Sequence, residues 1–207
     1  IKTNGALKIT GGLQATSDPE LVFNKFPNID YLIMGESEFV LKEFADKIKS
    51  GNQISDINGS SYIKEKKIII NPKQKIIDSL DKFSPYNYDI FDDQVFFRPY
   101  NGEVVRAVDY ELSRGCIYSC SYCVETVIQK YYGFEESSSK TGAIKNFKSY
   151  LRNKSANVIF DEITYLVKEK NINFIRCQDT NFLTNDRKIL MELANKIKKS
   201  DLNFRIY

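Results

Sequence analysis

"ELSRGCIYSCSYCVE", residues 111–125, holds three of the four cysteines of the chain. They are Cys116, Cys120 and Cys123, so three residues separate the first two and two residues separate the last two. The apolar stretch at residues 104–112 precedes them and predicts a strand. Because thiolates bind soft metals, three of them clustered behind a strand predict a metal or redox site.

The composition limits the classes of protein to consider. The chain has 207 residues, of which 42% are hydrophobic, enough for one large domain or two small ones. Its net charge is only +3, which argues against a dedicated nucleic-acid binder. It has no run of about 18 apolar residues and no visible signal peptide, so we expect no membrane contact and a cytoplasmic protein. The clustered cysteines do not resemble a secreted disulfide framework.

Two absences shape the further expectations. The sequence contains no histidine, so metal ligands must come from thiolates, carboxylates or a bound small molecule. It does not begin with methionine, and strand-like segments lie near both ends, at residues 6–10 and 202–207. We therefore expect the chain to be a piece of a longer protein.

Residues 1–75 predict the C-terminal part of a doubly wound, Rossmann-like α/β domain followed by a hairpin. Asp18-Pro19 favours a helix start, because Asp caps a helix and Pro suits its first turn. The predicted elements are strands at 6–10 and 29–34, helices at 19–26 and 38–49, and hairpin strands at 61–63 and 68–70 around a charged turn.

Residues 76–103 are aromatic, lack a helical period and predict an ordered linker. Residues 104–207 alternate strand and helix again, which predicts the first half of a parallel (β/α) barrel. The predicted elements are strands at 104–112, 172–177 and 202–207, a helix capped by Ser155 that ends near residue 170, and a helix capped by Asn185 or Asp186. The segment 126–150 is hard to assign, and residues 135–142 predict a loop.

The number of thiols leaves several metal sites open. A four-iron cluster has four corners, so three cysteines would leave one iron without a protein ligand. A structural zinc site would need a fourth ligand, which Cys177 could supply. Cys177, at the end of a predicted strand, is otherwise typical of a small buried hydrophobic residue. Buried thiols without metal are the third alternative.

The pattern Cys-x-x-x-Cys-x-aromatic-Cys behind a strand, with Tyr122 as the aromatic residue, resembles the signature of the radical S-adenosylmethionine (SAM) superfamily. The resemblance implies that Cys116, Cys120 and Cys123 hold a 4Fe–4S cluster whose open iron binds SAM, with Tyr122 at the cofactor site. It also implies a reducing partner such as flavodoxin or ferredoxin, whose electron cleaves SAM to a 5′-deoxyadenosyl radical. "CQDTNF", residues 177–182, resembles the polar end of the second barrel strand, which implies that Asp179 contacts SAM.

Residues 9–44, "ITGGLQATSDPELVFNKFPNIDYLIMGESEFVLKEF", resemble the C-terminal half of the cobalamin-binding domain found ahead of many radical enzymes. The resemblance implies that Gly11, Gly12, Gly35 and Glu36 lie at the cobalamin. Glycine at the carboxyl ends of strands lets a ligand approach the backbone closely. The cobalt-ligating histidine of that family has no counterpart in this chain.

These resemblances together imply a cobalamin-dependent radical SAM enzyme that transfers a methyl group, or performs related radical chemistry, on a small biosynthetic molecule. Such enzymes rely on their cofactors for the chemistry, while the protein orients them. The sequence identifies neither the substrate nor a catalytic side chain. Two alternatives remain: a radical SAM enzyme without cobalamin, similar to the methylthiotransferases, and a non-catalytic zinc or iron–sulfur module.

Overall fold

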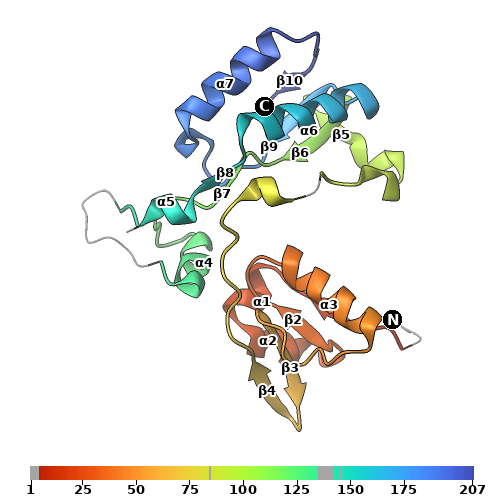
Figure 1. Cartoon of the computed structure of the whole chain (residues 1–207), viewed down its shortest axis with the longest axis vertical. Helices are drawn as coiled ribbons and strands as arrows, with labels where there is room; N and C mark the ends of the chain where they lie inside the picture. Colours follow the sequence, from red (N-terminus) through yellow and green to blue (C-terminus); the bar gives the residue numbers. More distant parts are fainter. Residues whose placement is uncertain (1–4, 84, 135–141, 145) are drawn as a thin grey trace. The chain divides into compact units, whose positions relative to one another are not determined.

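The computed structural model describes residues 5–83, 85–134, 142–144 and 146–207, and it divides into two compact units (Figure 1). The first unit comprises Ile1–Ile77 and Tyr118–Asn146, and the second comprises Asp78–Ile117 and Phe147–Tyr207. Cys116 therefore belongs to the second unit, whereas Cys120 and Cys123 belong to the first. The loop predicted at residues 135–142 lies, apart from Gly142, outside the described residues.

A four-stranded mixed sheet forms the first unit. Its order is β1-β2-β3-β4, with β1 parallel to β2 and the other neighbours antiparallel. The elements are β1 (Ile9–Thr10), α1 (Leu13–Ser17), α2 (Pro19–Lys25), β2 (Tyr31–Ile33), α3 (Glu38–Ser50), β3 (Ser60–Lys64), β4 (Lys67–Ile70) and α4 (Glu125–Tyr132). The predicted hairpin thus extends the parallel pair into one sheet.

The buried strand β2 explains why helices cover both faces of this sheet. Successive side chains of a strand point to opposite faces. Leu32 packs with Phe23 of α2, whereas Ile33 packs with Phe44 of α3. The helix α2 begins as predicted, because the side chain of Asp18 accepts a hydrogen bond from the amide of Leu21 at 2.9 Å.

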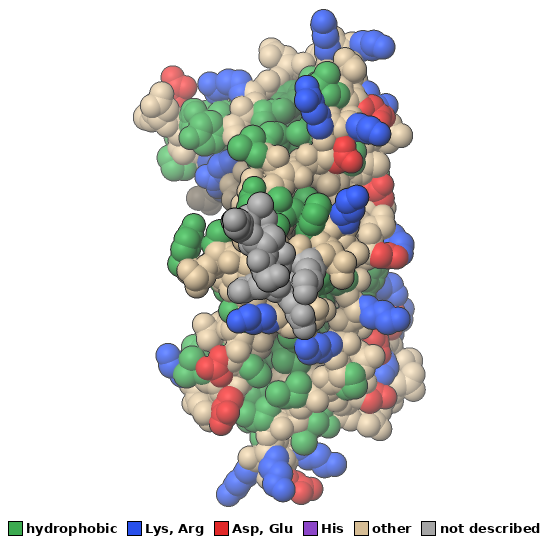
Figure 2. Space-filling view, turned by 90° about the vertical axis from the view of Figure 1, so that its left-hand side faces the viewer, with side chains coloured by type: hydrophobic (Ala, Val, Ile, Leu, Met, Phe, Trp, Pro, Cys, Tyr) green, Lys and Arg blue, Asp and Glu red, His purple; other side chains and the backbone are tan. Residues whose placement is uncertain are grey.

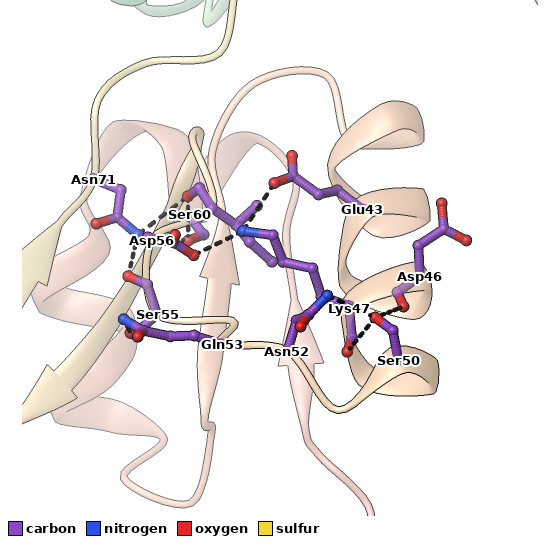
Figure 3. Close-up of polar contacts among 11 residues, drawn as sticks. Glu43, Asp46, Lys47, Ser50, Asn52, Gln53, Ser55, Asp56, Ser60 and Asn71 are labelled. Atoms are coloured by element: carbon purple, nitrogen blue, oxygen red, sulfur yellow. Dashed lines mark hydrogen bonds and ion pairs between the residues drawn. The ribbon is translucent and has the colours of Figure 1, made fainter.

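Side-chain hydrogen bonds hold the connection from α3 to β3 (Figure 3). The amide of Asn71 donates to the carbonyl oxygens of Ser55, at 2.9 Å, and Ile57, at 3.1 Å. Lys47 forms an ion pair with Asp56 at 2.7 Å, but Asp56 is largely exposed, so the pair adds little stability. We therefore regard this network as structural support for the hairpin.

The turn of the hairpin is charged. Glu65 and Lys66 have φ angles of 50° and 63°, the positive values that a two-residue hairpin turn requires. Figure 2 shows Lys or Arg side chains gathered at this tip, where Lys64 of β3 lies opposite Lys67 of β4 in the strand register.

A second four-stranded sheet forms the core of the second unit. Its order is β10-β9-β6-β5, in which β6, β9 and β10 are parallel and β5 is antiparallel to β6. The strands and α-helices are β5 (Phe97–Tyr100), β6 (Glu103–Tyr110), β7 (Ser113–Arg114), α5 (Phe147–Tyr150), β8 (Arg152–Asn153), α6 (Ala156–Glu169), β9 (Phe174–Cys177), α7 (Arg187–Lys198) and β10 (Arg205–Ile206). Short 3₁₀ helices lie at Leu80–Lys82, Tyr88–Ile90, Asp93–Phe96 and Phe182–Thr184.

Both long helices of this unit begin where the sequence predicts. The side chain of Ser155 caps α6 by accepting from the amide of Val158, and Asp186 caps α7 by accepting from the amide of Lys188. Their apolar faces and the strands β6 and β9 share one core. Residues 97–100, inside the predicted linker, form β5 instead, where Pro99 is tolerated because β5 is an edge strand.

The chain is thus an α/β protein with mixed sheets. Within the described ranges, no helix combines the length and the apolar composition that crossing a membrane requires.

Candidate functional site

The segment that leads into Cys116 is held by the end of the neighbouring strand β9. Asp179 accepts a hydrogen bond from the hydroxyl of Ser113 at 2.5 Å and one from the amide of Leu112 at 3.3 Å. The side-chain amide of Asn185 donates to the same carboxylate at 3.3 Å. Because β6 and β9 are parallel neighbours, their carboxyl ends meet at one edge of the sheet. Asp179 therefore fixes the direction of the chain just before the first cysteine.

Gly115 lies in this segment at a point where no side chain fits. Its φ of +92° is in the left-handed region, and an added Cβ would lie 2.5 Å from the carbonyl oxygen of Tyr150. The sulfur-bearing residue that follows, Cys116, is buried. The leading side of the loop is therefore fixed by backbone contact as well as by hydrogen bonds.

The other two cysteines lie in a turn that runs into α4. The amide of Cys123 donates to the carbonyl oxygen of Cys120 at 3.0 Å, and the hydroxyl of Thr126 donates to that of Cys123 at 2.8 Å. Gln129 of α4 is only 1% exposed, and its amide donates to the carbonyl oxygen of Tyr118 at 3.0 Å. Tyr122 is 91% exposed, so its ring contacts solvent rather than the loop.

The three cysteines divide between the two units, with Cys116 in the second unit and Cys120 and Cys123 in the first. Within either unit, the residues that the structure describes include no group of three Cys, His, Asp or Glu side chains that could hold a metal ion. None of the four cysteines forms a disulfide within the described part of the chain. Burial, with a smaller contribution from the charge of Asp179, raises the pKa of the Cys177 thiol to about 11. Cys177 also packs against the core of the second unit, as a small hydrophobic residue does.

The predicted cofactor glycines lie at the carboxyl ends of β1 and β2, which Thr16 joins. The hydroxyl of Thr16 donates to the carbonyl oxygen of Gly12 at 2.9 Å and accepts from the amide of Gly35 at 2.8 Å. An added Cβ on Gly12 would meet no atom within 4 Å, so that side of the edge is open. An added Cβ on Gly11 would lie 3.1 Å from the carbonyl oxygen of Ile33, a close backbone contact.

Two tyrosines of α4 fill the other side of this edge. An added Cβ on Gly35 would collide with the hydroxyl of Tyr132 and lie 2.9 Å from the ring of Tyr131. The amide of Glu36 donates to the hydroxyl of Tyr132 at 2.6 Å, and the hydroxyl of Tyr131 donates to the carbonyl oxygen of Met34 at 3.3 Å. Contact with protein leaves no room for a side chain at Gly35. At Gly12 the φ of +94° favours glycine, while the space beside it is open.

A buried charged group supports the second unit next to the cysteine loop. Lys154 is 2% exposed, forms an ion pair with Glu162 at 2.7 Å, and donates its backbone amide to the carbonyl oxygen of Leu112. The hydroxyl of Tyr110 donates to Glu162, and burial together with that charge raises the pKa of Tyr110. Glu162 also lines a cavity of about 500 Å³ with Tyr86.

Sequence reasoning missed Thr16, Gln129, Tyr131 and Tyr132 as residues of this site. The contacts of Tyr131 and Tyr132 join segments that lie far apart in the chain, and α4 falls in a stretch that could not be assigned. The only local signal was the aromatic run "QKYYGFEE", residues 129–136, which is typical of a pocket mouth or, more commonly, of a loop. Residues 129–132 of this run belong to α4.

Sequence comparison finds similarity to two methyltransferases, one of which is a cobalamin-dependent radical SAM enzyme. No protein-family profile matches it. The chain is 25% identical over 195 residues to an uncharacterized methyltransferase of Pyrococcus horikoshii, covering 94% of this chain and 38% of the relative. It is 31% identical over 119 residues to the cobalamin-dependent radical SAM methyltransferase TokK of Streptomyces tokunonensis, covering 56% of this chain and 17% of TokK.

Comparison with solved structures supports the same relationship at the level of the fold. The cobalamin-dependent SAM radical enzyme OxsB, with aqua-cobalamin and SAM bound, matches with a TM-score of 0.65 and 18% identity over 96% of this chain and 25% of OxsB. The radical SAM methyltransferase TsrM of Kitasatospora setae, with cobalamin and a 4Fe–4S cluster bound, matches with a TM-score of 0.56 and 19% identity, covering 94% of this chain and 34% of TsrM.

The chain is homologous to cobalamin-dependent radical SAM enzymes over a part of their length. It spans from 17% to 38% of the length of the curated relatives that it matches.

Proposed function

We propose that this chain is part of a cobalamin-dependent radical SAM enzyme in which Cys116, Cys120 and Cys123 hold a 4Fe–4S cluster. The observation that carries the proposal is the spacing of these cysteines at the carboxyl end of β6, in a chain homologous to such enzymes. Three thiolates suit a cluster that keeps one iron for SAM. The parallel strands β6, β9 and β10 would then be the first strands of a barrel whose catalytic end carries the loop.

Asp179 is the side chain that we propose for the methionine amine of SAM. A carboxylate offers about four lone-pair positions, and Asp179 accepts three hydrogen bonds from described residues. About one position therefore remains for the amine. Asp179 would then connect SAM directly to the segment that leads into Cys116. The assignment of Tyr122 to the same site stays a prediction.

Cobalamin would bind on one side of the glycine edge, which is the edge of the first sheet that carries Gly11, Gly12 and Gly35. Gly12 is open, so this side accepts a group that approaches the backbone, with Gly11 beside it. Tyr132 covers Gly35 on one side. Gly35 and Glu36 would therefore contact the cofactor only where Tyr132 leaves them uncovered. Bound cobalamin would supply methyl-transfer chemistry to the parent enzyme. The chain has no histidine, so it would provide no imidazole ligand to cobalt.

The cluster chemistry requires partners outside the chain. Reduced flavodoxin or ferredoxin would supply the electron for cleavage of SAM, and a small molecule would be the substrate. The cysteines that would hold a cluster must not be oxidised to disulfides, which requires a reducing compartment. We therefore propose a cytoplasmic protein.

The proposal is tested by reconstituting the full chain with iron and sulfide under anaerobic conditions and recording the electron paramagnetic resonance (EPR) spectrum of the reduced cluster. We expect the signal of a reduced 4Fe–4S cluster to shift when SAM is added, because SAM would bind the open iron. Formation of 5′-deoxyadenosine and methionine would show cleavage. A purified chain that contains zinc instead of iron would favour the non-catalytic module. A cluster whose EPR spectrum does not change when SAM is added would favour it too.

A further inference from the structure

We propose that helix α4 ties the Cys120–Cys123 side of the cysteine loop to the glycine edge of the first sheet, with Tyr132 as its positioning residue. The inference rests on the proposed function, since a cluster at these cysteines is what gives the tie a role. It concerns contacts inside the first unit alone.

The N-terminal half of α4 holds the cysteine loop. Thr126, in its first turn, donates to the carbonyl oxygen of Cys123, and Gln129 donates to that of Tyr118. These two bonds reach both sides of Cys120. Because Gln129 is fully buried, its amide holds Tyr118 in one geometry rather than exchanging with water.

The last turn of α4 holds the glycine edge. Tyr132 occupies the space beside Gly35 and accepts the amide hydrogen of Glu36, while Tyr131 donates to Met34. The two rings pack edge to face, with centroids 5.0 Å apart. The hydroxyl of Tyr132 bonds a backbone amide and fills the space that a side chain at Gly35 would need. This contact fixes both Tyr132 and the backbone at Gly35.

The tie also reaches the open side of the edge. Thr16 hydrogen-bonds both glycine loops, so a displacement of Gly35 is transmitted to Gly12. A ligand bound at Gly12 and a cluster bound at Cys120 and Cys123 would therefore be coupled through α4. Such coupling is reciprocal, so each cofactor would change the affinity for the other by the same factor.

The first test uses the full chain without cofactors. Amide hydrogen exchange of residues 118–132 is compared in Gly35→Ala and Tyr132→Phe, with Gly51→Ala and Tyr62→Phe as matched controls. Gly51 also has a positive φ, of +69°, but an added Cβ there meets no atom within 4 Å. Tyr62 lies in β3 of the same sheet, and its hydroxyl makes no hydrogen bond with the described residues.

We expect exchange in residues 118–132 to become about tenfold faster in both test variants, the effect of losing one well-placed, partly buried hydrogen bond. The controls should leave these residues at the wild-type rate. Adding Tyr132→Phe to Gly35→Ala should speed exchange little beyond either single variant, because both changes break the same contact between Tyr132 and the Gly35–Glu36 backbone. If Gly35→Ala fails to fold, Tyr132→Phe decides the outcome alone.

The second test uses the reconstituted cluster. Tyr132→Phe should retain the iron content of the wild type but change the EPR line shape of the reduced cluster, and Tyr62→Phe should not. Wild-type exchange rates and EPR spectra in both Tyr132→Phe and Gly35→Ala would overturn the inference. A wild-type chain that takes up no cluster would instead overturn the proposed function, while the exchange test would still decide whether α4 forms the tie.

Discussion

The two sides of the cysteine loop are held by different chemistry. On the Cys116 side, the carboxylate of Asp179 accepts the hydrogen bonds and a buried ion pair supports the neighbouring backbone. On the Cys120–Cys123 side, the groups are neutral: a threonine hydroxyl and a glutamine amide. Hydrogen bonds to charged groups are stronger than neutral ones. The difference teaches that the Cys116 side is the more costly one to break.

The largest effect is expected at the buried ion pair beneath the Cys116 side. Glu162→Ala leaves the charge of Lys154 buried and unpaired, which should reduce the free energy of unfolding by about 3–5 kcal/mol. Urea denaturation of the full chain, followed by tyrosine fluorescence and circular dichroism, measures this loss.

Two controls sharpen this prediction. Replacing both partners, Lys154→Met with Glu162→Leu, should restore part of the stability, because no unpaired charge remains although the hydroxyl of Tyr110 loses its partners. Asp201→Ala, which removes a largely exposed partner of Lys168, should change stability little. A loss in Glu162→Ala no larger than that in Asp201→Ala would contradict the charged support of this side.

The next effect is expected at Gly115. Gly102 has a similar positive φ in the same unit but open space around it, so Gly102→Ala measures backbone strain alone, about 1–2 kcal/mol. Gly115→Ala adds a collision with the carbonyl oxygen of Tyr150 and should cost about 1–3 kcal/mol more. Thermal denaturation of the two variants gives the difference. Equal melting temperatures would show that the Tyr150 contact does not constrain the loop.

A smaller contrast compares one hydrogen bond on each side. Ser113→Ala removes a donor to the Asp179 carboxylate and should cost about 1.5–3 kcal/mol. Thr126→Val removes a neutral hydroxyl–carbonyl bond while keeping the shape of the side chain, and should cost about 0.5–1.5 kcal/mol. Both are measured by urea denaturation. A reversed order would refute the distinction between a charged and a neutral side.

The smallest effect is expected at Tyr131 in the first unit, and only in alkaline solution. Burial raises the pKa of Tyr131 to about 12, above the value of about 10 in an unfolded chain. The folded state therefore keeps this proton, and its contribution to stability is complete below pH about 10 and is lost as pH rises toward 12. Tyr131→Phe should flatten this part of the pH profile of the melting temperature. An unchanged alkaline profile in Tyr131→Phe would show that Tyr131 is not protected as described.

The two hairpins show how far the sequence predicted the fold. The β3–β4 hairpin was predicted from two apolar runs around a charged turn and is confirmed. The β5–β6 hairpin was missed, although Asn101-Gly102 has the positive φ angles of a tight turn and is a strong hairpin signal. Pro99 and the aromatic residues around it hid the alternation, because an edge strand tolerates both.

The candidate site divides along similar lines. The cysteine spacing and the strand end at Asp179 are local patterns, so the sequence could indicate them. The contact of Tyr132 with Gly35 joins residues nearly one hundred positions apart, and no local pattern encodes it. In the sequence, a glycine at position 35 could make room for a cofactor or for a tyrosine. Only the packing of α4 shows that a tyrosine takes this space.

The most direct test of the account is the iron content of reconstituted cysteine variants. The wild-type chain should bind about four irons and about four sulfides. Alanine at Cys116, Cys120 or Cys123 should abolish most of this uptake, while Cys177→Ala should retain all of it. Full uptake in any of the three variants, or loss of uptake in Cys177→Ala, would contradict the claim that these three thiolates alone bind the cluster.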